Sequence, residues 1–229
     1  KAYQPKLPVA LRKGALNVTL NKGKATESVR DQKKIKALFP NTYGAPYIQL
    51  KAGKAQGEAK ALNVGVVLSG GQAPGGHNVI AGIFDGIKSI NPKSKLLGFL
   101  GGPSGLENGK FIVINEKIMD SYRNTGGFDI IQSGRTKLET EEQFKKCMAV
   151  AKAQKLDAIV IIGGDDSNTN AAVLGEYFQA NGASCVVCGC PKTIDGDLKN
   201  EYIETSFGFD TAVKTYSELI GNIMRDANS

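Results

Sequence analysis

The fold of this chain is decided at residues 63–78, which read NVGVVLSGGQAPGGHN. The apolar run Asn63–Leu68 predicts a strand, the glycines after it predict a tight loop, and a helical pattern continues to about Ser89. Glycines let backbone amides approach an anion closely, and the helix directs the positive end of its dipole to the same place. The stretch favours a phosphate-binding loop. A glycine-rich turn that only packs a strand tightly against a helix would look the same.

The same order of strand, polar glycine-rich loop and helix recurs along the chain. Leu156–Ile162 is the most convincing buried strand, and GGDDSNT at 163–169 follows it before a helix that is expected to reach about Asn181. Because parallel strands bring the loops at their carboxyl ends to one edge of a sheet, a ligand site is expected there. We therefore predict an α/β fold with a three-layer, Rossmann-like parallel sheet. The other predicted strands are Lys95–Leu100, Phe111–Ile114, Phe128–Ile131 and Cys185–Cys190, the last of them buried.

Charged side chains gather in two of these loops. Residues 191–197 read PKTIDGD and place one cation and two carboxylates directly after a strand. Asp165 and Asp166 stand side by side after two glycines. Two adjacent carboxylates at a strand end are costly without a cation, and the simplest partner is Mg²⁺ that accompanies a phosphate.

Two further polar residues are candidates with open roles. Arg135 follows a predicted strand and lies beside Gly134. An arginine in a loop is most often a solvated charge, but in this place it can also offer a planar fork to a phosphoryl group. His77 is the only His in the chain and could be a catalytic base. Its position at a helix start favours a hydrogen-bonding or packing role.

Positive charge is concentrated at the amino-terminal end. The 229 residues carry a net charge of +7, but residues 1–60 hold 13 Lys and Arg against 3 Asp and Glu, which leaves a net charge of −3 for the remainder. Few aromatic residues lie among these charges, and no helix-turn-helix or RNA-binding pattern occurs. A solvated face or a subunit contact is therefore favoured over nucleic-acid binding. Residues 1–62, with an amphipathic helix near Ser28–Leu38, are interpreted as an N-terminal basic extension.

Composition indicates a globular chain from a reducing compartment. No apolar stretch approaches the roughly 20 residues that cross a bilayer. The start of the chain, Lys1–Pro5, lacks the apolar core of a signal peptide, so we expect a cytoplasmic protein without a membrane partner. Of four Cys, only Cys188 and Cys190 would share a strand face, and no nearby His completes a metal shell. The Cys residues are interpreted as small buried thiols.

Five spaced motifs together resemble the phosphofructokinase family. They are SGGQAPG at 69–75, GR at 134–135, GGDDSNT at 163–169, PKTIDGD at 191–197 and SFGFDTA at 206–212. The match runs in order from about Phe39 to the last residue, and it is most similar to the long, plant-type, pyrophosphate-dependent branch. The resemblance implies reversible, Mg²⁺-dependent phosphoryl transfer from pyrophosphate to the 1-hydroxyl of fructose 6-phosphate, as in glycolysis and gluconeogenesis. The products would be fructose 1,6-bisphosphate and phosphate.

On the sugar side, the resemblance assigns three residues of the PKTIDGD motif. Asp195 would be the base that accepts the proton of the 1-hydroxyl, which requires its carboxylate within hydrogen-bond reach of that oxygen. Thr193 and Asp197 would hold the sugar and support the Asp195 carboxylate.

On the donor side, the resemblance implies that the Gly71 amide binds pyrophosphate, that Asp165 holds Mg²⁺ and that Arg135 stabilises the phosphoryl group in flight. Asp166 and Lys192 stand where ATP-using relatives typically have glycine, which leaves room for the α-phosphate of a nucleotide. A carboxylate and an ammonium in that space predict pyrophosphate as the donor, by occlusion and by a cation aimed at the short donor.

The sequence departs from the family pattern in one respect. The family's clamp for the sugar 6-phosphate comes largely from a second domain after a Met-Gly-Arg motif, which does not occur here. We therefore expect residues 63–229 to be the donor-binding domain, the C-terminal sugar-phosphate domain to be absent from this chain, and the chain alone to be inactive. The resemblance also implies a homo- or hetero-oligomer, a dimer or higher.

Two alternative functions are open. Plant-type enzymes pair catalytic with regulatory subunits of the same fold, and a regulatory chain would bind ligand without chemistry. The intact Asp195, Lys192 and Asp166 favour the catalytic subunit. The other alternative is an ATP-dependent kinase with a Gly-Gly-Asp loop, as in lipid and NAD kinases, but those enzymes lack PKTIDGD.

Overall fold

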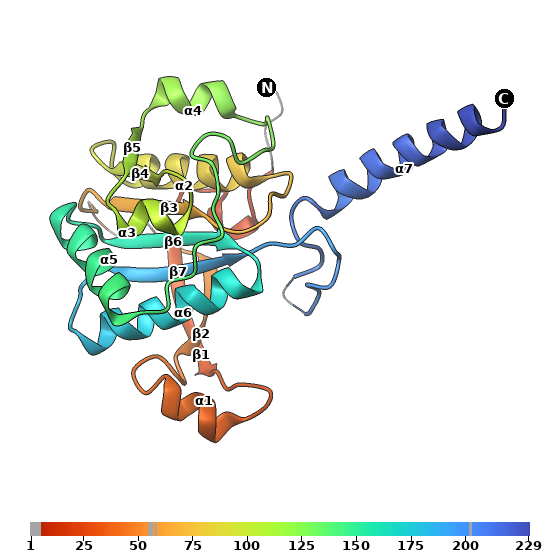
Figure 1. The fold of residues 1–229 in the computed structure, drawn as a ribbon. Coiled ribbons are helices and arrows are strands. Elements are labelled where there is room, and N and C mark those ends of the chain that lie inside the picture. Colours follow the sequence, from red (N-terminus) through yellow and green to blue (C-terminus); the bar gives the residue numbers. More distant parts are fainter. Residues whose placement is uncertain (1–5, 55–56, 58, 202) are drawn as a thin grey trace.

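A computed structural model describes residues 6–54, 57, 59–201 and 203–229. Their main body is a five-stranded sheet with the strand order β5-β4-β3-β6-β7 (Figure 1). Strands β3, β4, β6 and β7 are parallel, and β5 is antiparallel to β4. The strands are β3 (Asn63–Leu68), β4 (Lys95–Phe99), β5 (Phe111–Ile114), β6 (Ala158–Gly163) and β7 (Val186–Pro191).

Helices cover both faces of this sheet. Successive strand residues point to opposite faces, so Val66 and Leu68 pack with α2 and α4, whereas Val67 packs with α3, α5 and α6. The predicted three-layer α/β arrangement is therefore confirmed. The helices are α2 (Gly76–Ile90), α3 (Pro103–Glu107), α4 (Glu116–Tyr122), α5 (Glu141–Ala153) and α6 (Asp165–Ala180).

Two strand predictions need correction. Strand β5 was expected in a parallel sheet but is antiparallel to β4. The connection from Phe99 to Phe111 is short, and a parallel pair needs a crossover of a dozen or more residues. Residues 128–131 are not a strand but a buried turn. Phe128, Ile130 and Ile131 fill the core beside α2, whereas Asp129 is exposed, and periodicity cannot separate this pattern from a short buried strand.

Strand β7 was expected to be buried, and this is wrong. It lies at the edge of the sheet and pairs only with β6 among the described strands. Val187 packs toward α6, but Val186, on the other face, is 50% exposed. The apolar composition of β7 therefore reflects one covered face rather than two.

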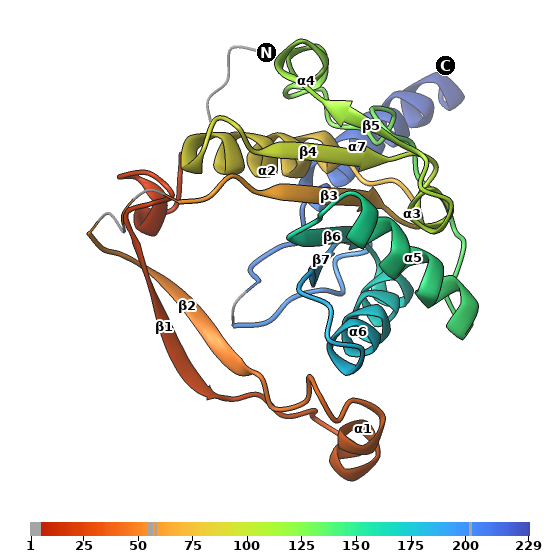
Figure 2. The ribbon, with the colours of Figure 1, turned by 90° about the vertical axis from the view of Figure 1, so that its left-hand side faces the viewer.

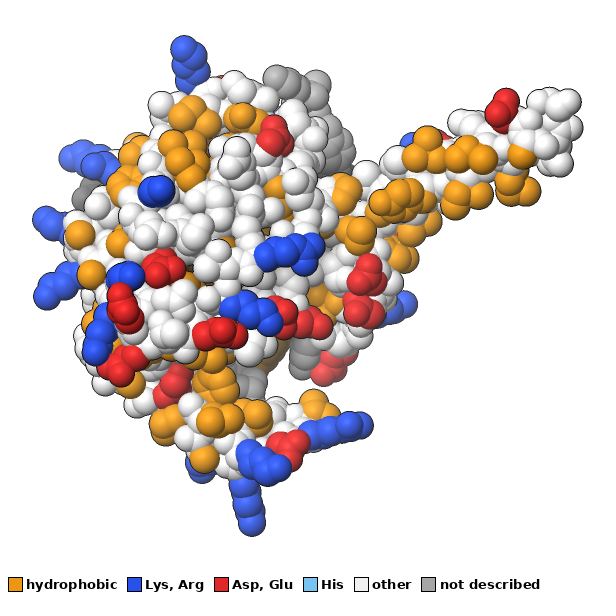
Figure 3. All heavy atoms as spheres, viewed as in Figure 1, with side chains coloured by type: hydrophobic (Ala, Val, Ile, Leu, Met, Phe, Trp, Pro, Cys, Tyr) orange, Lys and Arg blue, Asp and Glu red, His pale blue; other side chains and the backbone are white. Residues whose placement is uncertain are grey.

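The last helix, α7 (Phe209–Ala227), projects from the body, as Figure 1 shows. Six of its apolar side chains recur at helical spacing, are about half exposed or more, and contribute to the orange stripe along the helix in Figure 3. They are Val213, Tyr216, Leu219, Ile220, Ile223 and Met224. No helix in the described part of the chain is long and apolar enough to cross a membrane.

The amino-terminal segment forms an arm of its own. A short 3₁₀ turn, η1 (Val9–Leu11), precedes an antiparallel hairpin of β1 (Val18–Ala25) and β2 (Pro46–Ala52), with α1 (Gln32–Leu38) between the strands. Figure 2 shows the hairpin running along one side of the body, with α1 at its far end. The predicted helix near Ser28–Leu38 thus forms, but it begins four residues later.

One buried carboxylate fastens the far end of this arm to the body. Glu176 on α6 is 9% exposed, and its side chain accepts hydrogen bonds from the backbone amides of Asn41 and Thr42 at 2.9 Å each. The hydroxyl of Thr42 donates to the same carboxylate at 2.7 Å. Burial tends to raise the pKa of Glu176, but these hydrogen bonds outweigh it and the net pKa is lowered.

Replacing Glu176 by Gln is expected to release the arm. A neutral amide accepts more weakly, so two backbone amides lose charge-assisted bonds at a cost of about 2 kcal/mol. The amides of Asn41 and Thr42 should then exchange with solvent roughly 30-fold faster, since about 1.4 kcal/mol is a factor of ten. Residue-resolved hydrogen exchange measures this directly.

The matched control for Glu176 is Glu142→Gln, which removes an exposed carboxylate paired with Lys146. It should leave the exchange of residues 41 and 42 unchanged. Because the folded pKa of Glu176 is lowered, its stabilisation is present above the unfolded pKa of 4.5 and is lost as the pH falls through the folded pKa. Equal exchange in wild type and Glu176→Gln would show that the arm is held by other contacts.

Candidate active site

The loops after β3, β6 and β7 meet at the carboxyl edge of the sheet. The amide of Ser69 donates to the carbonyl of Ile162 at 2.8 Å. The amide of Lys192 donates to the carbonyl of Gly163 at 3.0 Å. Three motifs that are far apart in the sequence are therefore adjacent.

Gly163 is required by this close approach. A Cβ atom there would collide with the Cβ of Ser167 and would lie 2.6 Å from the carbonyl oxygen of Ser69. The space is taken by a buried hydroxyl pair, in which Ser167 Oγ donates to Ser69 Oγ at 2.8 Å. This pair joins the start of α6 to the end of β3 and forms the floor of the site.

A fourth loop brings Arg135 to the same edge. The amide of Gly70 donates to the carbonyl of Gly134 at 2.9 Å, and Ser69 and Gly134 form an isolated parallel bridge. A Cβ added at Gly71 would lie 3.5 Å from Nη2 of Arg135. The guanidinium therefore lies directly beside the glycine loop.

Lys192 is the buried cation of the site, with 9% of its surface exposed. Burial lowers the pKa of Lys192, the charge of Arg135 lowers it further, and the carboxylate of Asp195 acts in the opposite direction. Because the charges of Lys192 and Arg135 repel each other, an anion that binds near both of them is stabilised.

The two carboxylates expected in a loop instead open a helix. Asp165 and Asp166 are the first two residues of α6, where acidic side chains suit the helix dipole. Both are exposed, and Asp166 lies 3.3 Å from Nζ of Lys137. This partner was not anticipated from the sequence.

The PKTIDGD segment starts at Pro191, the last residue of β7, and runs through the buried Lys192 into a turn that is exposed at residues 195–197. The amide of Asp195 donates to Oγ1 of Thr193 at 3.0 Å, and the side chains of Asp195 and Asp197 are exposed. The amide of Thr193 donates to the buried Oγ of Ser206 at 2.8 Å. Ser206 belongs to the SFGFDTA motif at residues 206–212. The sequence does not predict its contact with Thr193, because the donor is a backbone amide, which every residue except proline has.

Comparison with known proteins decides the family. A family model described as Phosphofructokinase matches residues 63–229. The chain belongs to the phosphofructokinase family. The family resemblance and the phosphofructokinase-like fold are thus confirmed, whereas the individual roles of the site residues stay predictions, as does the division into residues 1–62 and 63–229.

Relatives of this phosphofructokinase chain carry a more specific name. A Porphyromonas gingivalis protein named pyrophosphate–fructose 6-phosphate 1-phosphotransferase is 58% identical over 228 residues, which cover 100% of this chain and 41% of the relative. Subunit beta 2 of the enzyme of that name from Arabidopsis thaliana is 52% identical over 90% of this chain and 37% of its own length. The chain thus spans about two fifths of these relatives. A solved phosphofructokinase from Saccharomyces cerevisiae shares the fold, with a TM-score of 0.62 and 20% identity over 73% of this chain and 24% of the yeast chain.

His77 is part of the scaffold of this phosphofructokinase site. It is 1% exposed, and its Nε2 accepts the amide hydrogen of Ile130 at 3.1 Å. Its Nδ1 lies 2.8 Å from the hydroxyl of Thr125, which itself donates to a carbonyl. Nδ1 therefore carries the proton in the neutral ring. The packing role favoured from the sequence agrees with these contacts.

Lowering the pH below about 6.5 is expected to destabilise the fold through His77. Burial lowers the pKa of His77, and the nearby carboxylate of Asp129 offsets only part of this. The unfolded chain therefore binds a proton first, so the stability is complete above the unfolded pKa and declines as the pH falls from there toward the folded pKa.

Since His77 is the only His, NMR titration of its imidazole reports the folded pKa without ambiguity. A value at or above 6.5 would contradict the prediction. In His77→Gln the urea midpoint should change less between pH 7.5 and pH 5.5 than in wild type.

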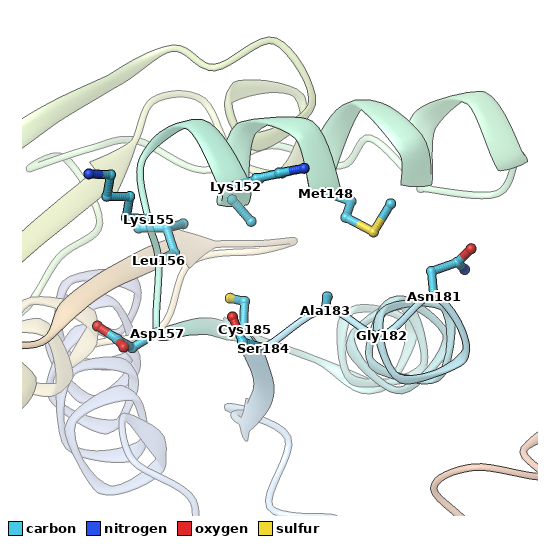
Figure 4. Close-up of a pocket in the computed structure, with 11 residues that line it drawn as sticks. Met148, Lys152, Lys155, Leu156, Asp157, Asn181, Gly182, Ala183, Ser184 and Cys185 are labelled. Carbon is cyan, nitrogen blue, oxygen red and sulfur yellow. The ribbon is translucent and has the colours of Figure 1, made fainter.

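A cavity lies at the opposite end of the sheet from the site (Figure 4). It has a volume of about 490 Å³ and is lined by the end of α5 and by residues that enter β6 and β7, among them Met148, Lys152 and Cys185. Burial raises the pKa of the Cys185 thiol to about 11, so it is a poor nucleophile.

The four Cys do not all follow the prediction of buried thiols. Cys147 and Cys185 are buried, whereas Cys188 is exposed and Cys190 is half-buried. The difference arises because β7 is an edge strand. In the described part of the chain no three His, Cys, Asp or Glu side chains are gathered so as to hold a metal ion.

Proposed function

We propose that this chain supplies the donor site and the base of a pyrophosphate-dependent phosphofructokinase. The reaction transfers a phosphoryl group from pyrophosphate to the 1-hydroxyl of fructose 6-phosphate and yields fructose 1,6-bisphosphate and phosphate. The observation that carries the proposal is the guanidinium of Arg135 beside Gly71, with the buried Lys192 close enough for the charge of Arg135 to lower its pKa. The names of the curated relatives support the same reaction.

The donor is held by charge and by backbone. The amide of Gly71 binds an oxygen of pyrophosphate, and the two cations neutralise the phosphate nearest to them. Because Lys192 is buried, its charge acts in a low dielectric, so its attraction for the donor phosphate is stronger than that of a solvated ammonium group. Arg135, on a separate loop, stabilises the phosphoryl group as it leaves the donor.

Mg²⁺ suits this donor arrangement. Magnesium is commonly held by one or two protein carboxylates together with substrate phosphates, rather than by a complete protein cage. Asp165 at the exposed start of α6, beside Asp166, fits that mode. When bound, the ion supplies charge that neutralises the oxygens of the transferring group.

The acceptor is activated by Asp195. Its exposed carboxylate takes the proton of the sugar 1-hydroxyl, while Thr193 and Asp197 hold the sugar and support the base. Asp166 and Lys192 fill the space that a nucleotide α-phosphate needs, so pyrophosphate is preferred over ATP.

The remaining functional statements belong to the same proposal. Reversibility, a place in glycolysis, a cytoplasmic location and assembly with like or related subunits follow from the family. The names of plant relatives, which distinguish beta from alpha subunits, support a hetero-oligomer. A regulatory subunit without chemistry is the second candidate, but the intact pair of Asp195 and Lys192 favours a catalytic one.

A coupled assay of the full-length protein that contains this chain tests the proposal. With fructose 6-phosphate and Mg²⁺, pyrophosphate should support turnover at least about 100-fold better than ATP, which corresponds to a preference of roughly 2.7 kcal/mol. Equal or better use of ATP would overturn the donor assignment, and no turnover with either would favour the regulatory subunit. The 229-residue chain alone should be inactive.

A further inference from the structure

Ser206 carries a buried hydroxyl that contacts the catalytic turn, residues 193–197, which contains the proposed base. It is 4% exposed, and its Oγ accepts the amide hydrogen of Thr193 at 2.8 Å. Thr193 in turn accepts the amide hydrogen of Asp195 through Oγ1 at 3.0 Å. Two successive hydrogen bonds thus run from a buried residue to the backbone of the proposed base.

Ser206 is itself held by the donor loop. Its neighbour Phe207 packs against Gly75, where an added Cβ would lie 2.8 Å from the ring. The next residue, Gly208, has φ of 90°, and a Cβ there would lie 2.7 Å from the carbonyl oxygen of Pro74. Only glycine fits this approach without strain. The segment 206–208 is therefore wedged between the glycine loop and the catalytic turn.

We propose that Ser206 is a positioning residue that sets the distance between the base and the donor phosphate. The inference rests on the proposed function. Ser206 reaches the reaction only through Thr193, but it ties residues 193–195 to the same loop that carries Gly71. Since a displacement of about 1 Å from productive geometry can cost roughly 100-fold in rate, loss of this link should be visible in kcat.

The structure offers a matched control at the other end of the sheet. Ser94 is also fully buried, and its Oγ also accepts a backbone amide hydrogen, from Leu62 at 3.0 Å. Removing either hydroxyl leaves one buried amide without its acceptor, so the two alanine variants should lose similar stability. Only Ser206 lies beside the catalytic turn.

The test is steady-state kinetics of Ser206→Ala, Ser206→Thr and Ser94→Ala in the full-length protein. We expect kcat with pyrophosphate to fall about 10- to 100-fold in Ser206→Ala, with the KM for pyrophosphate within about twofold of wild type. Ser206→Thr keeps the acceptor and should retain most of the activity. Ser94→Ala should have a lower unfolding temperature than wild type but the same kcat.

The outcomes distinguish failure of the positioning role of Ser206 from failure of the proposed function. If wild type shows no activity with pyrophosphate, the proposed function fails. If wild type is active and Ser206→Ala keeps its kcat, or if Ser94→Ala loses as much kcat, the positioning role is overturned. Should Ser206→Ala not fold, Ser206→Cys takes its place. Sulfur is a weak acceptor, so the same fall in kcat is expected.

Discussion

Asn in place of Asp195 is expected to lower kcat for phosphorylation of fructose 6-phosphate by at least about 1,000-fold in the full-length protein. A positioned general base contributes roughly 10²- to 10⁴-fold, and an amide of the same shape cannot accept the proton. Because the contact of Asp195 with Thr193 uses its backbone amide, the turn should keep its conformation. The initial rate of the coupled assay, with both substrates saturating, measures the effect.

The KM for pyrophosphate shows whether Asp195→Asn removes only the base or also disrupts the binding of the donor. It should stay within about twofold in Asp195→Asn, since an interaction made only in the transition state affects kcat. Asp226→Asn, on the projecting α7, is the control and should match wild type. A kcat for Asp195→Asn within tenfold of wild type would exclude Asp195 as the base.

The second large effect is expected when Asp166 and Lys192 are both replaced by Gly. Loss of the buried ammonium removes one of two cations at the donor site, and removal of one such electrostatic group typically costs 10²- to 10³-fold in kcat. At the same time the pair of glycines opens the space that a nucleotide α-phosphate requires. The double variant should therefore lose at least about 100-fold of its pyrophosphate activity and gain measurable use of ATP.

The two single variants show how much of the change in donor use comes from loss of the Lys192 charge and how much from the space that is opened. Lys192→Gly should account for most of the loss with pyrophosphate, because its charge is buried, whereas Asp166 is exposed. Lys199→Gly, an exposed Lys a few residues further on, should change neither donor. Full pyrophosphate activity in the double variant would refute the assignment of this pair.

Much of the candidate site could be predicted because it follows strand ends. The loops at 69–71, 163–166 and 191–197 were recognised as following apolar runs, and parallel pairing of β3, β6 and β7 brings them together. The orientation of β5 does not follow from its composition, because four apolar residues suit either direction, but the short connection from Phe99 to Phe111 does favour an antiparallel pair. In the turn at 128–131 the exposed Asp129 stands between buried apolar residues, a pattern that a short strand also shows.

Individual hydrogen bonds and ion pairs between distant segments could not be predicted from the sequence. Glu176 occupies an ordinary helical position, yet it binds the turn at residues 41–42. Ser206 and Lys137 likewise gain their partners only when separate loops meet. Such contacts depend on three-dimensional placement, whereas periodicity reports only which face of an element is apolar.

The hydroxyl pair of Ser69 and Ser167 also bears on how the protein folds. These residues are 98 positions apart, so the floor of the donor site cannot exist until β6 has paired with β3 across that separation. Contacts of this range require closure of a long loop before they contribute any stabilising free energy, which makes folding slow compared with helical proteins of similar size. A nascent chain therefore cannot bind its donor while only the first sheet strands have emerged from the ribosome.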